Sequence, residues 1–289
     1  MKKERMEVPY STGREVPLTT LPAGSCDTHC HIFDPVHYPY KPDDTRNQPP
    51  ATVGCYRLLM RRLGIDRCVV VTPSAYGIDN RCTLHALKRF GDAARGVAVI
   101  DEKTTDQELA WMNEQGIRGI RFNVVSGSRG SLEHMAELAE RIKKYQWHIL
   151  LWLPADILVD IHKWLWKLPC QVVFDHRGHI PAEIGVQHKA FEIISDMMKD
   201  DRAYVKLSAL YHDSKDPVYR DTIDLSLKYI EQEENHVLWG TDWPHHSEVI
   251  NRRVLPDDAK MLDMLVNAIQ DKMKIQKLFV DNPKKLYRF

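Results

Sequence analysis

The chain has 289 residues, enough for one large domain or two small ones, and 43% hydrophobic residues can supply a sizeable core. Its 40 basic and 40 acidic residues cancel and form no charged tail, which argues against nucleic acid or an anionic membrane as a partner. No apolar run is long enough to span a membrane, and the first twenty residues lack the apolar segment of a secretion signal.

The six cysteines show no repeating spacing, and a chain of this length does not need disulfides for stability. We therefore expect reduced thiols and a cytoplasmic protein.

Eight apolar segments alternate with helical patterns along the chain. The expected strands are residues 26–33, 67–74, 94–101, 117–124, 148–154, 170–178, 203–210 and 236–244. Several are almost continuously apolar, as strands buried on both faces should be. The expected helices are residues 56–64, 83–91, 104–116, 131–145, 155–168, 189–200, 222–233 and 258–270, and an extra helix from residue 274 stops before Pro283.

Several helix ends carry recognisable signals. Gly64 and Gly91 follow the first two helical patterns, where a left-handed glycine commonly terminates a helix. Thr105 or Asp106 is the expected N-cap of the third helix, and Ser131 is the expected start of the fourth.

The alternation of eight strands with eight helices predicts parallel βα units, and the count matches a (β/α)8 barrel. An open doubly wound sheet would need a glycine-rich first turn, whereas the first strand leads into a proline-rich, polar segment. We interpret that segment as a long loop over the active face. No linker or internal repeat is visible, so we expect an extension at residues 1–21 and a single α/β barrel domain at residues 22–289.

Polar residues collect at the carboxyl ends of the expected strands, which share one mouth in a barrel. His29 and His31 are one residue apart on the first strand and therefore point to the same face. The other residues at strand ends are Ser74, Arg121, Asn123, Trp152, Asp175, His176, Lys206 and Asp242. Each alone could be structural, but together they predict an active site.

Two chemistries are compatible with these groups. His29, His31, His176 and Asp242 could hold a divalent metal such as zinc. Without a metal, Asp242 would take a proton from water while the histidines donate hydrogen bonds to a carbonyl. Both schemes attack an electrophilic carbonyl with a positioned water.

Longer motifs narrow this choice. The H-x-H of the first strand, the "DH" of the sixth and "WGTDWPH" of the eighth resemble the amidohydrolase superfamily. A closer resemblance is to its branch of 2-pyrone-4,6-dicarboxylate lactonases and sugar-acid lactone enzymes. The segments "PAGSCDTHCHIFDP", "RGIRFN", "VFDHRGH" and "NPKKLY" extend that resemblance from about residue 22 to the end of the chain.

The resemblance implies a distorted (β/α)8 barrel that hydrolyses a lactone, with Asp242 as general base. His29, His31 and His176 would surround the carbonyl under attack. Several enzymes of this branch work without a metal, so we expect none to be required, with a single zinc on these four residues as the alternative. The bridging lysine or glutamate of two-metal relatives has no match on the fourth strand.

The resemblance also implies substrate contacts. Arg121 matches a carboxylate-binding arginine, Ser74 matches a substrate-contacting serine, and Arg129 in "SGSRGS" is a second candidate arginine. The expected partner is a small-molecule lactone.

Three departures from the dicarboxylate lactonase pattern bear on the substrate. His179 replaces an arginine, Trp152 replaces a tyrosine, and the segment after Lys206 is longer and lacks an arginine. These changes predict a less charged lactone, such as a sugar-acid lactone or a muconolactone relative, with Tyr211 and His212 bonding its hydroxyls. We expect Trp243 at the wall of the site.

Other functions remain open at this point. A lactone isomerase and a metal-dependent decarboxylase would use the same superfamily residues, and a non-catalytic barrel could bind a sugar acid. A homo-oligomer is compatible with the sequence, but no feature selects a partner surface.

Overall fold

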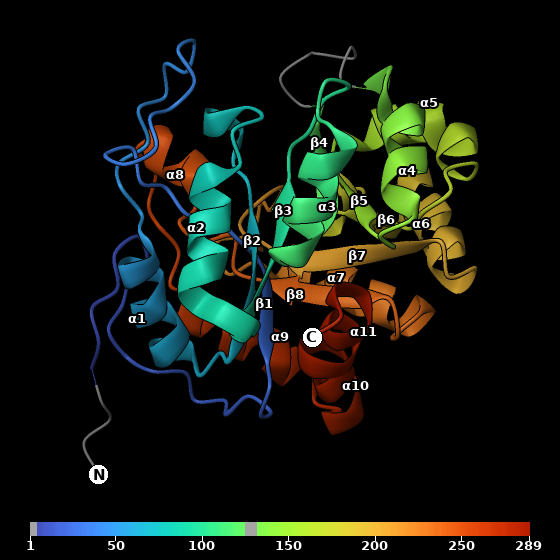
Figure 1. Ribbon diagram of the computed structural model, residues 1–289. Coiled ribbons are helices and arrows are strands. Elements are labelled where there is room, and N and C mark those ends of the chain that lie inside the picture. Colours follow the sequence, from blue (N-terminus) through green and yellow to red (C-terminus); the bar gives the residue numbers. More distant parts are fainter. Residues whose placement is uncertain (1–4, 125–131) are drawn as a thin grey trace. The chain divides into compact units, whose positions relative to one another are not determined.

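The computed structural model describes residues 5–124 and 132–289 (Figure 1). Eight strands follow one another in chain order in one sheet, with helices between them, so the fold is the expected (β/α)8 barrel. The chain divides into two compact units, residues 1–96 with 239–289 and residues 97–238.

The elements have the following bounds. The strands are β1 (Cys26–Cys30), β2 (Arg67–Val71), β3 (Ala94–Ala98), β4 (Ile117–Asn123), β5 (His148–Trp152), β6 (Val172–Phe174), β7 (Ala203–Ser208) and β8 (Val237–Gly240). The helices are α1 (Val53–Leu63), α2 (Arg81–Phe90), α3 (Asp106–Glu114), α4 (Met135–Lys143), α5 (Ala155–Leu165), α6 (Lys189–Lys199), α7 (Arg220–Gln232), α8 (His246–Ile250), α9 (Asp258–Ile269), α10 (Lys272–Gln276) and α11 (Asn282–Tyr287). Short turns of helix include η1 (Ser74–Tyr76), η4 (His176–His179) and η6 (Lys277–Asp281).

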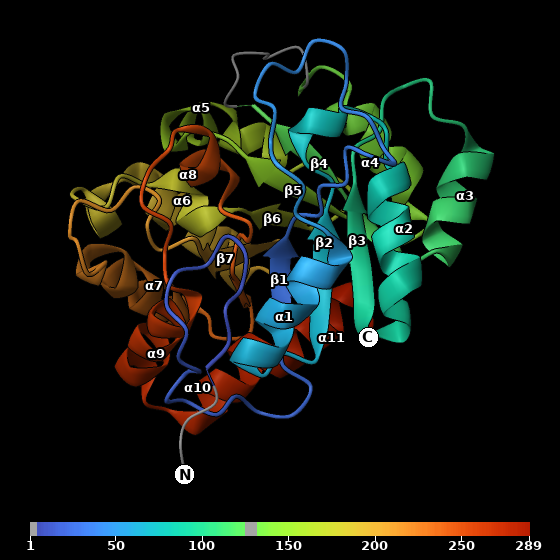
Figure 2. The same cartoon turned by 90° about the vertical axis from the view of Figure 1, so that its left-hand side faces the viewer.

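In the first unit, β1 and β2 pair in parallel, with Cys26 opposite Arg67 and an irregularity between Asp27 and Cys30. Every residue of β1 is buried. Helix α2 packs on β2, and α1 packs beside α9 (Figure 2). Residues 68–71 of β2 are buried as well, as their apolar composition predicts for a strand of a parallel sheet.

In the second unit, β4, β5, β6 and β7 pair in parallel in that order. Helix α3 packs on β4, α6 packs on β7, and α5 packs beside α6. Leu150 on β5, Val173 on β6 and Val205 on β7 are fully buried. This apolar layer supports the polar residues that follow the strand ends.

The helix-end predictions are mostly confirmed. Gly64 ends α1 in the left-handed conformation, and its N–H donates to the Met60 carbonyl. Thr105 is the N-cap of α3, where it and Glu108 form a reciprocal capping box. Helix α4 begins at Met135. Ser131, the expected start of this helix, lies outside the described residues.

The expected end of the last helix before Pro283 is wrong. Helix α10 passes through the wide turn η6 into α11, and Pro283 lies in the first turn of α11. A proline is tolerated there because the first N–H groups of a helix have no partner within the helix. The wide turn η6 therefore lets a new helix, α11, begin beside Pro283, where the proline would have interrupted a continuous regular helix.

The segment before β1 is tied to the first unit. Arg62 of α1, 1% exposed, donates hydrogen bonds to the carbonyls of Glu15 and Thr12 at 3.0 Å each. It also pairs with Asp257 at 2.6 Å, immediately before α9. The domain boundary expected at residue 21 stays a prediction, but the described part of this extension is anchored by a buried arginine.

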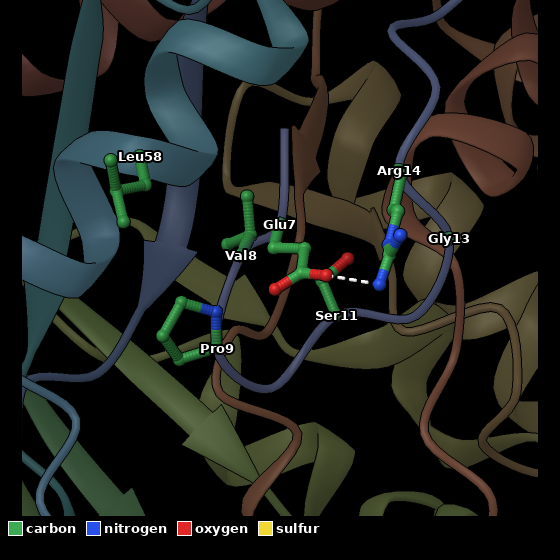
Figure 3. A pocket seen from close by; sticks show the side chains of 7 residues that line it. All are labelled: Glu7, Val8, Pro9, Ser11, Gly13, Arg14 and Leu58. Atoms are coloured by element: carbon green, nitrogen blue, oxygen red, sulfur yellow. Dashed lines mark ion pairs between the residues drawn. The ribbon is translucent and has the colours of Figure 1, made fainter. Parts of the chain in front are cut away.

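A hollow lies between this segment and α1 (Figure 3). It is lined by Glu7, Val8, Pro9, Ser11, Gly13, Arg14 and Leu58. Two of these lining residues, Glu7 and Arg14, form an ion pair. None of the predicted site residues lines it.

The segment predicted as a long loop, residues 31–50, lies between β1 and α1 and is held by specific hydrogen bonds. The Tyr40 hydroxyl donates to the Gln48 carbonyl at 2.6 Å, and the Gln48 side chain accepts from His246 Nδ1 at 2.7 Å. The Asp34 N–H donates to the Tyr76 hydroxyl at 2.8 Å. The loop is thereby attached to η1 and to the start of α8.

Two further expectations can be compared with the described residues. All six cysteines are free. Among the helices in the described ranges, none has both the length and the apolar character needed to cross a bilayer.

Candidate active site

His29 and His31 lie at the carboxyl end of β1, and both are buried. Their rings are nearly perpendicular, with centroids 4.9 Å apart, and their Nε2 atoms are 3.3 Å apart. His31 Nδ1 lies 2.7 Å from the Val71 carbonyl oxygen, which can only accept, so Nδ1 carries the proton. His31 therefore directs Nε2 toward its partner histidine, with its tautomer set by the end of β2.

Asp242 lies two residues after β8, directly beside these rings. Its Oδ1 is 3.5 Å from His29 Nε2 and 3.7 Å from His31 Nε2. Its N–H donates to the His29 carbonyl at 2.8 Å, and the His31 N–H donates to the Trp243 carbonyl at 2.8 Å. The β1 and β8 backbones thus bring a carboxylate and two imidazoles together, as the sequence predicts for these three residues.

Asp27, which is fully buried, holds the backbone at His29 in β1 and at Thr241 just after β8. Its carboxylate accepts hydrogen bonds from the His29 N–H at 2.9 Å, the Thr241 N–H at 3.0 Å and the Tyr56 hydroxyl at 2.7 Å. Complete burial raises the pKa of Asp27 to about 6, although these hydrogen bonds oppose the rise. The sequence does not predict a role for Thr241 or Tyr56, because both residues are distant from Asp27 along the chain.

A second buried pair lies behind Asp242. His245 Nε2 is 3.1 Å from Asp258 Oδ2, and both side chains are essentially inaccessible. Burial lowers the pKa of His245, but the adjacent Asp258 carboxylate outweighs that effect, so the net pKa is raised. The sequence alone does not predict this pair, because "DD" at residues 257 and 258 resembles an ordinary helix start.

Trp243 differs from its expected place at the site wall. It is fully buried, and its Nε1–H donates to the Pro9 carbonyl at 2.8 Å. Its ring packs against Tyr10 and Tyr56. Trp243 therefore anchors the N-terminal segment, because an indole buried beside a carbonyl gains both packing and a hydrogen bond.

In the second unit, His176 and His179 lie in the turn η4 that follows β6. The backbone φ angles are 46° at His176, 57° at Arg177 and 50° at His179, which are uncommon for residues other than glycine. Arg177 is fully buried and donates to the Ser208 carbonyl, which holds the turn against β7. Such over-determined strain is typical of functional turns.

The η4 histidines face polar and aromatic partners. His176 Nδ1 is 2.9 Å from the Ser208 hydroxyl, and its ring centroid is 5.1 Å from that of His212. His179 Nδ1 is 3.3 Å from Asp213 Oδ2, and the Trp152 ring lies 4.3 Å from its ring. Burial lowers the pKa of His179 despite the Asp213 carboxylate.

The remaining candidates of the second unit lie around this cluster. The Tyr211 ring packs 4.8 Å from that of His212. Arg121 at the end of β4 is 3.9 Å from Asp175, which also pairs with the fully buried Lys206 at 3.4 Å. Arg121 is therefore a buried charge beside a carboxylate. Arg129 lies outside the described residues.

Ser74, in the first unit, begins η1 just beyond β2. Its hydroxyl accepts a hydrogen bond from Arg46 at 2.9 Å. Arg46 has no role in the sequence analysis, because a single arginine in a polar loop forms no pattern.

His29, His31 and Asp242 meet the geometric requirements of a single metal. Their ligand atoms are 3.3, 3.5 and 3.7 Å apart. Ligand atoms about 2.0–2.1 Å from a tetrahedral zinc lie roughly 3.3 Å apart. The His31 Nδ1–H bond to a carbonyl is also the usual outer contact of a metal-bound histidine. These three residues could hold a metal ion.

The fold and these residues define a class of protein. Residues 26–289 match the family described as amidohydrolase, and the chain belongs to that family.

Three relatives with named activities resemble almost the whole chain. A 2-pyrone-4,6-dicarboxylate hydrolase of Comamonas testosteroni is 32% identical, covering 94% of this chain and 92% of its own. A 4-sulfomuconolactone hydrolase of Rhizobium radiobacter is 31% identical, covering 95% and 93%. A D-galactarolactone isomerase of Agrobacterium fabrum is 28% identical, covering 94% of each chain.

Among solved structures, an apo protein of Agrobacterium tumefaciens superposes with a TM-score of 0.86. It is 27% identical and covers 95% of this chain and 99% of its own. The likeness of fold therefore extends over both compact units.

Proposed function

We propose that the chain hydrolyses a lactone, with Asp242 as general base. The observation that carries this proposal is the position of Asp242 Oδ1, within 3.7 Å of both His29 and His31 at the ends of β8 and β1. Two relatives of about 30% identity are named as hydrolases of lactone substrates, which supports the same reaction class here.

In the proposed reaction, Asp242 takes a proton from a water molecule as that water adds to the lactone carbonyl carbon. His29 donates to the carbonyl oxygen, where negative charge develops in the tetrahedral intermediate. His31 donates there from Nε2 as an imidazolium, because its Nδ1 proton is already bonded to the Val71 carbonyl. The ring carbon–oxygen bond then breaks, and the departing oxygen receives the proton that Asp242 took. The product is an open-chain hydroxy acid, or its keto form when the departing oxygen is an enol.

We assign His176 to the same chemistry because it follows β6, and catalytic residues of barrel enzymes lie at the carboxyl ends of strands. On the same argument, Ser74, Arg121, Arg129, Trp152, His179 and Tyr211 are the proposed substrate contacts. Histidine and aromatic side chains suit the hydroxyls and ring faces of a substrate better than they suit a second substrate carboxylate. The proposed substrate is therefore less charged than an aromatic dicarboxylate.

Replacing Asp242 with Asn tests the base. The amide cannot accept the proton from water, so kcat should fall by about 10³-fold or more while the fold persists. Asp263→Asn in α9 is the control, since the Asp263 carboxylate accepts hydrogen bonds from the N–H groups of Leu18 and Thr19 and is not among the proposed site residues. Normal turnover by the Asp242 variant on a lactone that the wild type opens would refute the assignment.

Lactone isomerisation is the second candidate, because one relative is named as an isomerase. Isomerisation transfers the acyl group between hydroxyls and consumes no water. Turnover in ¹⁸O-labelled water, followed by mass spectrometry, should place one labelled oxygen in the product of hydrolysis. An unlabelled product of unchanged mass would favour isomerisation instead.

We further propose that turnover needs no resident metal. If a metal is bound, His29, His31 and Asp242 would hold it, with His176, and the ion would supply a Lewis acid for the carbonyl. Elemental analysis and activity after dialysis against a chelator test this. We expect unchanged turnover and no stoichiometric metal. Loss of activity that zinc restores would show that the residues act as ligands.

A further inference from the structure

Arg46 lies in the loop after β1 and has no part in the reaction described above. Its Nε donates to Asp44 Oδ2 at 2.8 Å, and one terminal nitrogen, Nη2, pairs with the same carboxylate. The other terminal nitrogen, Nη1, donates to the Ser74 hydroxyl at 2.9 Å. The guanidinium thus connects a loop carboxylate with Ser74, the serine predicted to contact the substrate.

This arrangement leaves donors for a ligand. A guanidinium carries five N–H groups, and these contacts use three of them. Ser74 accepts from Arg46, so its own hydroxyl proton has no partner within residues 5–124 and 132–289. The Arg46 side chain is 32% exposed, while Asp44 is 1% exposed, so the arginine lies on the open side of the pair.

The pair lies close to the predicted reaction centre within the first unit. Val71, whose carbonyl fixes His31, is three residues before Ser74, a separation of at most roughly 10 Å along the chain. Phe33, two residues after His31, stacks on Tyr76 of η1, with centroids 6.3 Å apart. Ser74 is therefore on the same end of β2 as the histidine pair.

The loop holds Arg46 in a defined position. The Asp44 carboxylate also accepts from the Arg46 N–H at 2.9 Å, so it closes a tight local turn. Lys41 N–H donates to the Ala75 carbonyl at 2.9 Å, next to Ser74. Preorganised donors of this kind lose little freedom when a ligand binds.

From this geometry, and resting on the proposed lactone hydrolysis, we propose that Arg46 and Ser74 together bind one acidic group of the substrate, a carboxylate or a sulfonate. Arg46 supplies the positive charge and an N–H, and Ser74 supplies its O–H, so two donors converge on one anion. Asp44 compensates much of the arginine charge, which limits the site to a single acidic group. Arg46 is thus a specificity residue that selects a monoanionic end of the lactone.

Binding of a simple anion tests this without turnover. Isothermal titration of glutarate and of the uncharged glutaramide should show that the wild type prefers glutarate. Arg46→Gln should weaken glutarate binding by about 10- to 100-fold and leave glutaramide binding unchanged. Arg46→Lys, which keeps the charge but not the fork, should fall between them.

Arg81→Gln is the matched control. Arg81 pairs with Asp79 two residues before it, as Arg46 pairs with Asp44, but its side chain is 67% exposed. The control should bind glutarate as the wild type does, and thermal unfolding should show that all variants fold.

Two results would overturn the proposal: equal binding of glutarate and glutaramide by the wild type, or an undiminished preference for glutarate in Arg46→Gln. Neither result bears on lactone hydrolysis, which the Asp242→Asn variant tests separately. If Arg46→Gln loses glutarate binding while Asp242→Asn stays active, the anion site would be supported. The assignment of Asp242 as general base would then be rejected.

Discussion

The backbone at Asp242 and at His245 is left-handed, with φ angles of 63° and 58°. Residues other than glycine adopt this region at a cost of order 1–3 kcal/mol, so the surrounding contacts must compensate for it. Here the Asp242 N–H bonds to the His29 carbonyl, and the His245 N–H bonds to the Asp242 carbonyl. The turn after β8 thus directs one carboxylate at two imidazoles.

Cys82, which is buried, and Cys170, which is partly exposed, give a prediction at the same scale. Burial raises the pKa of Cys82 to about 11 and that of Cys170 to about 12. Because only the thiolate reacts, both residues should resist alkylation in the native protein at pH 8. Their rates should rise about tenfold for each pH unit up to those pKa values, as iodoacetamide labelling and peptide mass spectrometry can measure.

Unfolding in guanidinium is the control for this experiment, and all six cysteines should then react at pH 8. Rapid labelling of Cys82 or Cys170 in the folded protein would contradict the burial that raises their pKa values. The prediction is separate from catalysis, since neither thiol has a role in the proposed reaction.

At the scale of elements, the spacing of β1 and β8 depends on Gly240. A Cβ atom at residue 240 would lie 2.8 Å from the His29 Cβ and 2.9 Å from the His29 nitrogen. Backbone cannot yield as a flexible side chain can, so the two strands would separate. Gly240→Ala should cost about 1–3 kcal/mol of stability, and it should lower kcat/KM much further by parting His29 from Asp242.

Urea unfolding and steady-state kinetics measure these two effects. Gly54→Ala is the matched control, because a Cβ at residue 54 in α1 would meet only the Thr52 hydroxyl, at 3.6 Å. That variant should gain about 0.5–1 kcal/mol and keep its activity, since alanine favours a helix over glycine. Wild-type kinetics in Gly240→Ala would show that strand spacing does not control the site.

Element types are predictable from the sequence here, but several ends are not. The expected strand at residues 170–178 shrinks to Val172–Phe174, because the chain turns at once into the left-handed η4. Such turns depend on Arg177 bonding carbonyls of the β7 end, a contact between residues about 30 positions apart. Local patterns contain no information about that contact.

The residues of the candidate site also divide into those that the sequence predicts and those that it does not. His29, His31 and Asp242 are predictable because they stand in recognisable motifs at strand ends. Asp258, Tyr56 and Arg46 are not, since each acts through a partner distant in sequence or through a loop conformation. Trp243 was expected beside substrate because of its neighbour, whereas its true partner is the Pro9 carbonyl.

At the scale of the whole molecule, the segment before β1 contributes to stability through Arg62. This side chain is buried with Asp257 and bonds two carbonyls of the segment. Removing one partner of a buried ion pair typically costs about 3–5 kcal/mol. Arg62→Gln should therefore lower the unfolding free energy by about that amount, as denaturant titration can measure.

Arg61→Gln is the control, since Arg61 is the exposed neighbour in the same helix turn. It should change stability by less than about 0.5 kcal/mol. If the Arg62 variant is as stable as this control, the segment is not anchored as the hydrogen bonds indicate.

The bond between the Trp243 indole and the Pro9 carbonyl has a practical consequence for handling the protein. An exopeptidase that removes the chain up to and including Tyr10 would take away the Pro9 carbonyl. That carbonyl accepts the hydrogen bond from Trp243, the residue next to Asp242. Turnover would then decay with chain shortening while circular dichroism stayed almost unchanged, so ageing preparations should be checked by intact mass as well as by spectrum.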